Sequence, residues 1–120
     1  MKNISFSLTK NQFRDRTKDV TRRLGWGDLE DGTSLSVCEK CQGIKPGEKL
    51  VRMGVIDIVD VRHERLDRMI SDPKYGKAEA AREGFPDLTG AEFVAMFCKH
   101  MKCLSSQVVT RIEFEISVIY

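Results

Sequence analysis

The chain has 120 residues and a formal net charge of +2, and 41% of its residues are hydrophobic. This length suits one domain with a modest core, and this composition excludes both a disordered chain and a membrane-spanning one. The longest apolar runs are only a few residues, so we expect no transmembrane segment. The N-terminus lacks the apolar core of a signal peptide. We therefore expect a cytoplasmic protein whose cysteines stay reduced unless a metal binds them.

The first half of the chain predicts strands around one short helix. Residues 3–8 alternate polar and apolar side chains and predict a strand with one buried face. Thr9 opens a capping-box pattern that begins a helix over 10–16, and a tight turn is expected at 18–21. Loop residues rich in glycine then lead to a second strand at 35–37.

The second half predicts a long strand, two helices and a closing strand. Residues 50–61 supply one strand, or two strands broken at Gly54. A proline near its start and a glycine after its end predict a helix over 73–83. A second capping box begins a helix over 90–101, whose apolar residues form a stripe. Residues 111–118 show the clearest alternation in the chain.

Strands therefore cluster at both ends and in the middle of the chain, with helices between them. This order predicts a single α+β domain over residues 1–120 with a mostly antiparallel sheet closed into a barrel. We expect the first and last strands to pair. No internal repeat or linker interrupts the chain.

Basic residues concentrate between positions 10 and 23. They are Lys10, Arg14, Arg16, Lys18, Arg22 and Arg23. A local basic patch on a near-neutral protein fits a small anionic or nucleotide-like ligand or a short RNA, although a solvated helix face is the alternative. A tight turn would place the Lys18 amine near the Thr21 hydroxyl. Neighbouring positive charges favour a neutral lysine, which can act as a base for a hydroxyl nucleophile or for an attacking water.

Glu83 and Trp26 are candidate functional residues because of their positions in the sequence. Glu83 lies in the last turn of a predicted helix, where the helix dipole disfavours a carboxylate. A basic partner across a cleft, such as Lys18, would compensate; otherwise the carboxylate is simply solvated. Trp26 stands between two glycines and either stacks on a base or caps an open barrel end.

The four cysteines form two separate pairs in the sequence. Cys38 and Cys41 make a Cys-x-x-Cys motif at the end of a predicted strand, and Cys98, His100 and Cys103 lie across the end of the third predicted helix. Both pairs together, with His100 as a substitute for Cys98, are enough for a closed structural zinc site. The alternative is buried free thiols, and nothing else in the sequence requires a cofactor.

Four segments spread over nearly the whole chain carry a familiar pattern. They are Lys18-x-x-Thr21-x-Arg23, the glycine-led strand at 32–37, Glu83-Gly84-Phe85 and the closing strand at 109–114. Together they resemble the ASCH domain family. The Cys-x-x-Cys segment and the insertion at 65–85 are most similar to phage- and prophage-encoded members.

The resemblance implies a PUA-like fold, a small antiparallel or mixed β-barrel with inserted helices, that binds RNA or a modified nucleoside. In the family's nucleoside amidohydrolases the matching lysine, threonine and glutamate are the catalytic residues. By resemblance these are Lys18, Thr21 and Glu83, and the substrate is an N4-acylated cytidine-type nucleoside.

A non-catalytic RNA-binding module is the main alternative, and a ribonuclease is the third. In the RNA-binding module Lys18, Arg22 and Arg23 contact phosphates. Arg14 and Trp26 are further candidates for ligand contact in any of these functions.

The chain departs from the family pattern at two positions. Arg16 stands where the family usually has glycine, and Thr33 stands where it usually has aspartate. Arginine adopts a positive φ less easily than glycine. The substitution at position 16 therefore predicts a turn of different shape before Lys18.

Overall fold

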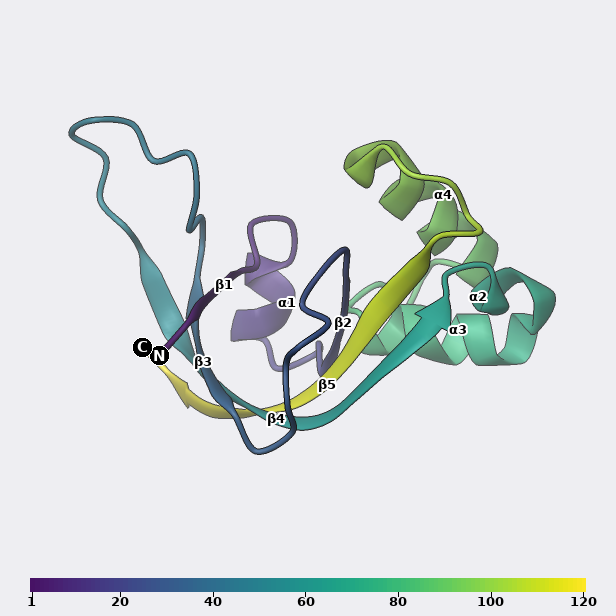
Figure 1. Ribbon diagram of the computed structural model, residues 1–120, viewed down its shortest axis with the longest axis horizontal. Helices are drawn as coiled ribbons and strands as arrows, with labels where there is room; N and C mark the ends of the chain where they lie inside the picture. The colour runs from purple at the N-terminus through teal and green to yellow at the C-terminus, as the bar shows by residue number, and fades with distance from the viewer.

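Five strands and four helices make up the computed structural model, which describes residues 1–120 (Figure 1). In chain order they are β1 (Asn3–Ser5), α1 (Lys10–Arg14), β2 (Val20–Arg23), β3 (Ser34–Cys38), β4 (Arg52–Arg65), α2 (Arg68–Ser71), α3 (Pro73–Arg82), α4 (Gly90–Met101) and β5 (Val108–Ile119). The strands form one sheet in the order β1-β3-β4-β5-β2. β1 and β3 pair in parallel, and the other neighbours pair antiparallel.

The sheet curls into a half-barrel around the long strands β4 and β5 (Figure 1). Their register shifts at Val55/Ile56 and at Ile58/Asp60, and such bulges bend a strand and increase its twist. Because β1 and β2 are the two edges of the sheet, the barrel stays open between them. The domain is thus α+β with a mixed sheet, compatible with a PUA-like barrel. None of its helices combines the length and apolar character needed to cross a bilayer.

The hollow of the half-barrel holds the first of two hydrophobic cores. Phe6 lies at its centre, with its ring 5.7 Å from that of Phe13 on α1 and 5.6 Å from that of Phe114 on β5. The other members are Ile4, Leu35, Val37, Met53, Ile56, Ile58 and Ile112. Phe13 is therefore the one side chain of helix α1 that is buried in the barrel core.

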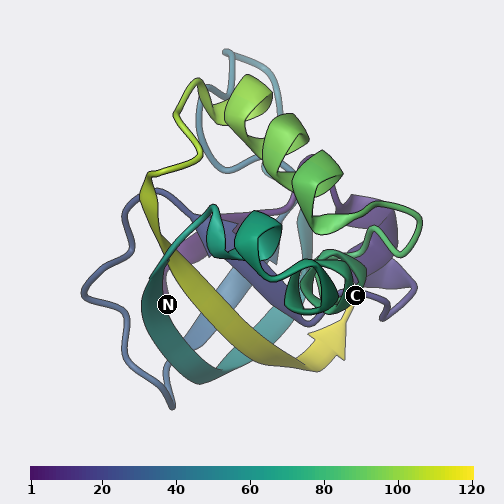
Figure 2. The same cartoon turned by 90° about the vertical axis from the view of Figure 1, so that its right-hand side faces the viewer.

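The second core lies where α2, α3 and α4 gather at one end of the sheet (Figure 2). Its buried members include Leu66, Met69, Phe93 and Val109. The helices approach closely because Gly76 of α3 and Gly90 of α4 face each other. A Cβ atom on either glycine would collide with the other glycine and with the backbone oxygen of Met69.

Several predicted elements are confirmed. The helix over 90–101 has the predicted bounds, and Thr89 and Glu92 form both hydrogen bonds of the capping box. The helix predicted over 73–83 ends at Arg82, and Gly84 follows with a φ of 102°. The strand predicted at 111–118 extends over Val108–Ile119.

Three other expectations are wrong. No turn forms at 18–21, because Lys18 and Asp19 lead directly into strand β2, which begins at Val20 and pairs with β5. The first strand pairs with β3 and not with the last strand. Helix α1 ends at Arg14, and the Thr9 side chain makes no capping hydrogen bond. Of the two alternatives for residues 50–61, the single strand is confirmed: β4 runs unbroken through Gly54, where glycine is needed because a Cβ atom would collide with the Val118 backbone oxygen.

The turn after α1 has the shape that glycine favours, although arginine occupies it. Arg16 has a φ of 61°. Its N–H donates to the Phe13 oxygen at 3.1 Å, and the Thr17 N–H donates to the Gln12 oxygen at 3.0 Å. These two bonds form a Schellman motif, in which the residue at the position of Arg16 is usually glycine. The expected change of shape at position 16 is therefore wrong, and the backbone is strained instead.

Replacing Arg16 with glycine should relieve this strain. The left-handed conformation costs a non-glycine residue about 1–2 kcal/mol, and the added chain entropy of glycine offsets up to about 1 kcal/mol of the gain. We expect Arg16→Gly to raise the free energy of unfolding by up to about 1 kcal/mol. Arg14→Gly, the same change inside helix α1, should lower it by about 1 kcal/mol. Urea denaturation of both variants decides, and a destabilised Arg16→Gly variant would contradict the analysis.

Candidate active site

A cavity of about 140 Å³ lies at the open seam of the half-barrel, between the edge strands and helix α4. Its polar wall comes mainly from β2 and the end of α3 and contains Lys18, Thr21, Arg23 and Glu83. Its apolar wall contains Phe6, Phe85, Phe93, Met96 and Phe97. Because a cavity of about 150 Å³ can hold benzene, this volume suits a single aromatic ring.

Lys18 and Glu83 form a buried ion pair in the polar wall. The Lys18 Nζ donates to Glu83 Oε1 at 2.9 Å and to the Glu83 backbone oxygen at 2.9 Å. Both side chains are at least 96% buried. The backbone oxygen belongs to the C-cap of α3, where the helix dipole favours a cation. Lys18 is thus the basic partner expected for Glu83.

Burial lowers the pKa of Lys18 below its usual value, because removing the ammonium from water costs free energy. The charge and the hydrogen bond of Glu83 oppose this effect. The positive charges of Arg23 and Arg22 lower the pKa further but contribute less. The neighbouring charges expected from the sequence are therefore a secondary cause, and desolvation is the main one.

Thr21 lines the same cavity but does not bond to Lys18. Its Oγ1 accepts a hydrogen bond from the Arg23 Nε at 3.1 Å. The hydroxyl proton of Thr21 is therefore not engaged by that bond. The structure brings Lys18, Thr21 and Glu83 to one cavity, with direct contact between Lys18 and Glu83 only.

Arg23 connects the two edges of the open barrel. From the end of β2, its Nη2 donates to the backbone oxygen of Ser5 on β1 at 2.6 Å. Its guanidinium carbon lies 5.2 Å from the centre of the Phe6 ring. Burial lowers its pKa to about 10, against the opposing charge of Glu83, so the guanidinium stays charged at neutral pH.

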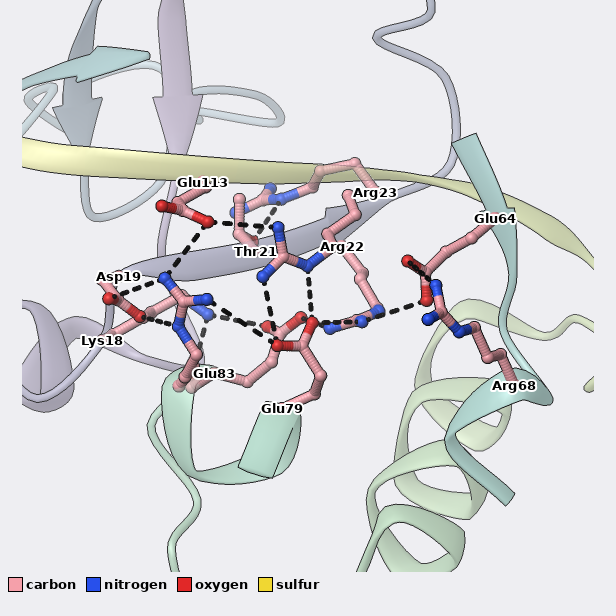
Figure 3. Close-up of polar contacts among 12 residues, drawn as sticks. Lys18, Asp19, Thr21, Arg22, Arg23, Glu64, Arg68, Glu79, Glu83 and Glu113 are labelled. Carbon is pink, nitrogen blue, oxygen red and sulfur yellow. Dashed lines mark hydrogen bonds and ion pairs between the residues drawn. The ribbon is translucent and has the colours of Figure 1, made fainter. Parts of the chain in front are cut away.

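Arg22 lines the cavity, but its guanidinium is already paired with carboxylates, so its predicted contact with a ligand stays a prediction. Its side chain is fully buried and its guanidinium meets three carboxylates, Glu79 at 2.6 Å, Glu83 at 3.1 Å and Glu64 at 3.3 Å (Figure 3). Along β2, alternate side chains point to opposite faces. Arg22 therefore points toward α3 and β4 and not toward a solvent-borne phosphate.

Glu79 is the residue that the sequence reasoning missed. Its carboxylate binds Arg22 and also Arg111 of β5, whose Nη2 lies 3.1 Å from Oε2. These bonds lower the pKa of Glu79 to about 2, although burial opposes the shift. The spacing of Tyr75, Glu79 and Glu83 puts them on one helix face, and that pattern is the signal that could have identified them.

Two other predicted ligand residues lie outside the cavity. Trp26 packs against the barrel core and lines a separate open hollow with Leu24 and Leu29. The barrel-capping alternative for this side chain therefore agrees with the structure. Arg14 is exposed on α1 and does not line the cavity.

The structure does not bring the four cysteines together. Cys38 and Cys41 are joined by a disulfide with their Cα atoms 5.9 Å apart, contrary to the expectation that they are reduced. Cys98 and Cys103 are free thiols whose sulfurs lie 4.0 Å apart. No group of three or more histidine, cysteine or acidic side chains is arranged to hold a metal. Zinc binding stays a prediction.

The chain matches no known family model. No curated protein sequence is detectably similar to it. Among solved structures it is similar to protein EF3133 from Enterococcus faecalis V583, described as DUF984, with a TM-score of 0.60 and 10% sequence identity. The match covers 95% of this chain and 72% of that one. It shows that the two chains share a fold.

The pKa of Glu79 predicts a loss of stability in acid. Its folded-state value of about 2 lies below its ordinary value of 4.5. The carboxylate therefore stabilises the fold fully above pH 4.5, by about 3 kcal/mol, and loses this contribution as the pH falls to about 2. Glu79→Gln should be less stable at pH 7 and should lose less stability between these pH values. The control is Glu115→Gln, because Glu115 is exposed. Denaturation curves from pH 7 to 2 that are parallel for Glu79→Gln and wild type would contradict this role.

Elemental analysis tests the zinc prediction. Structural zinc sites hold their metal tightly enough to survive purification without chelator. One equivalent of zinc per chain is expected if the predicted site forms, and less than about a tenth of an equivalent would favour the alternative of thiols without metal. One equivalent, lost in a variant with Cys38→Ser and Cys103→Ser together, would show that the pairs meet in a zinc site.

Proposed function

We propose that the cavity binds a pyrimidine-type nucleoside and hydrolyses the amide of an N4-acylated cytidine. The observation that carries this proposal is the buried Lys18–Glu83 pair in a wall shared with Thr21. A lysine whose pKa is lowered by burial is a candidate base, and strongly perturbed groups in a cavity are frequent at active sites. The resemblance to nucleoside amidohydrolases supplies the substrate class.

In the proposed reaction, neutral Lys18 takes the Thr21 hydroxyl proton while Oγ1 attacks the acyl carbon. The carbonyl oxygen becomes negative, and the guanidinium of Arg23, bonded to Thr21, stabilises this charge. Glu83 orients Lys18, accepts the proton that Lys18 has taken from Thr21, and passes it to the leaving amino group of the base as the C–N bond breaks. Water then cleaves the acyl ester on Thr21, which releases a carboxylic acid and the free hydroxyl.

The dimensions of the cavity support a small ligand. A volume of about 140 Å³ accommodates one ring against the apolar wall, with its polar edge toward Lys18 and Thr21. The remainder of a nucleoside would extend past Leu8 and Met101, which line the cavity and are 57% and 37% exposed. Binding RNA through phosphates alone fits less well, because Arg22 is enclosed by carboxylates.

Single substitutions test the catalytic roles. Lys18→Ala, Thr21→Ala and Glu83→Gln should each lower the rate of cytidine release from N4-acetylcytidine by about 10²–10⁴-fold, because each removes a proton-transfer or nucleophilic group. Thr33→Ala is the matched control, since Thr33 lies outside the cavity. Circular dichroism checks that each variant is folded.

The pH profile gives a second readout of Lys18. The rate should rise with pH as the amine loses its proton and should level off below the ordinary lysine value of 10.5, because burial lowers the pKa. Turnover that survives Lys18→Ala would defeat the mechanism. If no acylated nucleoside is hydrolysed, the non-catalytic RNA-binding module becomes the better proposal.

A further inference from the structure

Arg23 is the one cation of the polar wall that lacks a carboxylate partner. Lys18 pairs with Glu83, and Arg22 meets three carboxylates. Arg23 instead donates from Nε to a hydroxyl and from Nη2 to a backbone oxygen, both of which are neutral. Its charge is therefore not compensated within ion-pair distance.

Part of this guanidinium is open to the cavity. A guanidinium has five N–H groups, and two of those on Arg23 are used, so Nη1 has no partner in the protein. The one fully enclosed side-chain nitrogen or oxygen without a partner belongs to Arg22. The Nη1 of Arg23 therefore keeps accessible surface, and Arg23 lines the cavity.

Three basic residues, Lys18, Arg22 and Arg23, line the cavity against one acidic residue, so this end of the cavity is positively charged. Glu83 is the only acidic residue in the lining, and it is already bonded to Lys18 and Arg22. Arg23 stays protonated at neutral pH, since its pKa is about 10. A partly buried cation gains most from an anion that replaces the water it has lost.

We propose that Arg23 makes this end of the cavity a subsite for a small carboxylate, whose oxygens accept from Nη1 while its organic part lies against Phe93 and Phe97. Planar carboxylates match the planar N–H groups of arginine, whereas the apolar wall disfavours a fully hydrated phosphate. The inference rests on the proposed function in one respect, because amide hydrolysis releases such a carboxylate beside Thr21. A short aliphatic or single-ring acid fits the volume of about 140 Å³.

Benzoate is the probe, measured against the intact 120-residue chain by NMR titration or calorimetry. Benzyl alcohol has the same ring without the charge, and inorganic phosphate has the charge without the ring. We expect benzoate to bind wild type at least about tenfold more tightly than either, since a hydrogen bond to a charged group is worth about that factor. Arg23→Gln should remove this preference, and Arg23→Lys should restore part of it. Arg65→Gln is the control, because Arg65 is exposed and bonds to Asp67.

Each outcome decides the subsite. Equal affinity of wild type for benzoate and benzyl alcohol would overturn the proposed subsite. So would tighter binding of phosphate than of benzoate, or benzoate binding that is unchanged in Arg23→Gln. If Arg23→Gln does not fold, the comparison of the three probes on wild type and Arg23→Lys still decides. Benzoate binding without turnover of any acylated nucleoside would support the subsite and contradict the proposed function. Turnover without benzoate binding would support the proposed function and contradict the subsite.

Discussion

The buried guanidinium of Arg22 joins the helical part of the molecule to the sheet. Its side chain reaches from β2 to Glu79 and Glu83 at the end of α3, and to Glu64 of β4. An ion this deeply buried requires its partners, because removing one leaves an uncompensated charge at a cost of about 3–5 kcal/mol. The second arginine on Glu79, Arg111, ties β5 to the same helix. Helix α3 is thereby fixed in orientation, and Glu83 at its end is held in contact with Lys18 in the polar wall of the cavity.

The unclosed barrel creates the space in which these groups meet. Strands β1 and β2 are sheet edges with no backbone pairing between them, so a side chain makes the connection. Arg23 supplies it through the Ser5 backbone oxygen. Helix α4 covers the open seam. The aromatic residues of its apolar stripe belong to the second core and also line the cavity. In a fully closed barrel, backbone hydrogen bonds between β1 and β2 would occupy this position, and no cavity would remain between the two cores.

Local sequence signals predicted the elements that local interactions determine. The capping box at Thr89 and the stop at Gly84 are examples, since each depends on residues within a few positions. Strand β2 was missed because buried Arg22 breaks the apolar alternation that identifies a strand. The pairing of β1 with β3 depends on residues 33 positions apart in the chain, which periodicity does not encode. Resemblance to a family predicted Lys18, Thr21 and Glu83, which line one cavity in the structure, but residue spacing did not identify Glu79.

The same apolar surroundings have opposite consequences for the two cations above the Phe6 ring. The Lys18 Nζ lies 5.5 Å and the Arg23 guanidinium carbon 5.2 Å from the ring centre. Burial lowers the pKa of both groups. An amine can lose its proton under that influence and serve as a base, whereas a guanidinium with a pKa of about 10 keeps its charge at neutral pH. The proposed hydrolysis needs one group that accepts a proton and a second that stays positive beside the carbonyl oxygen. Because arginine is intrinsically more basic than lysine, one desolvated wall can supply both a proton acceptor and a lasting positive charge. Replacing Arg23 with lysine would reduce this difference between the two cations.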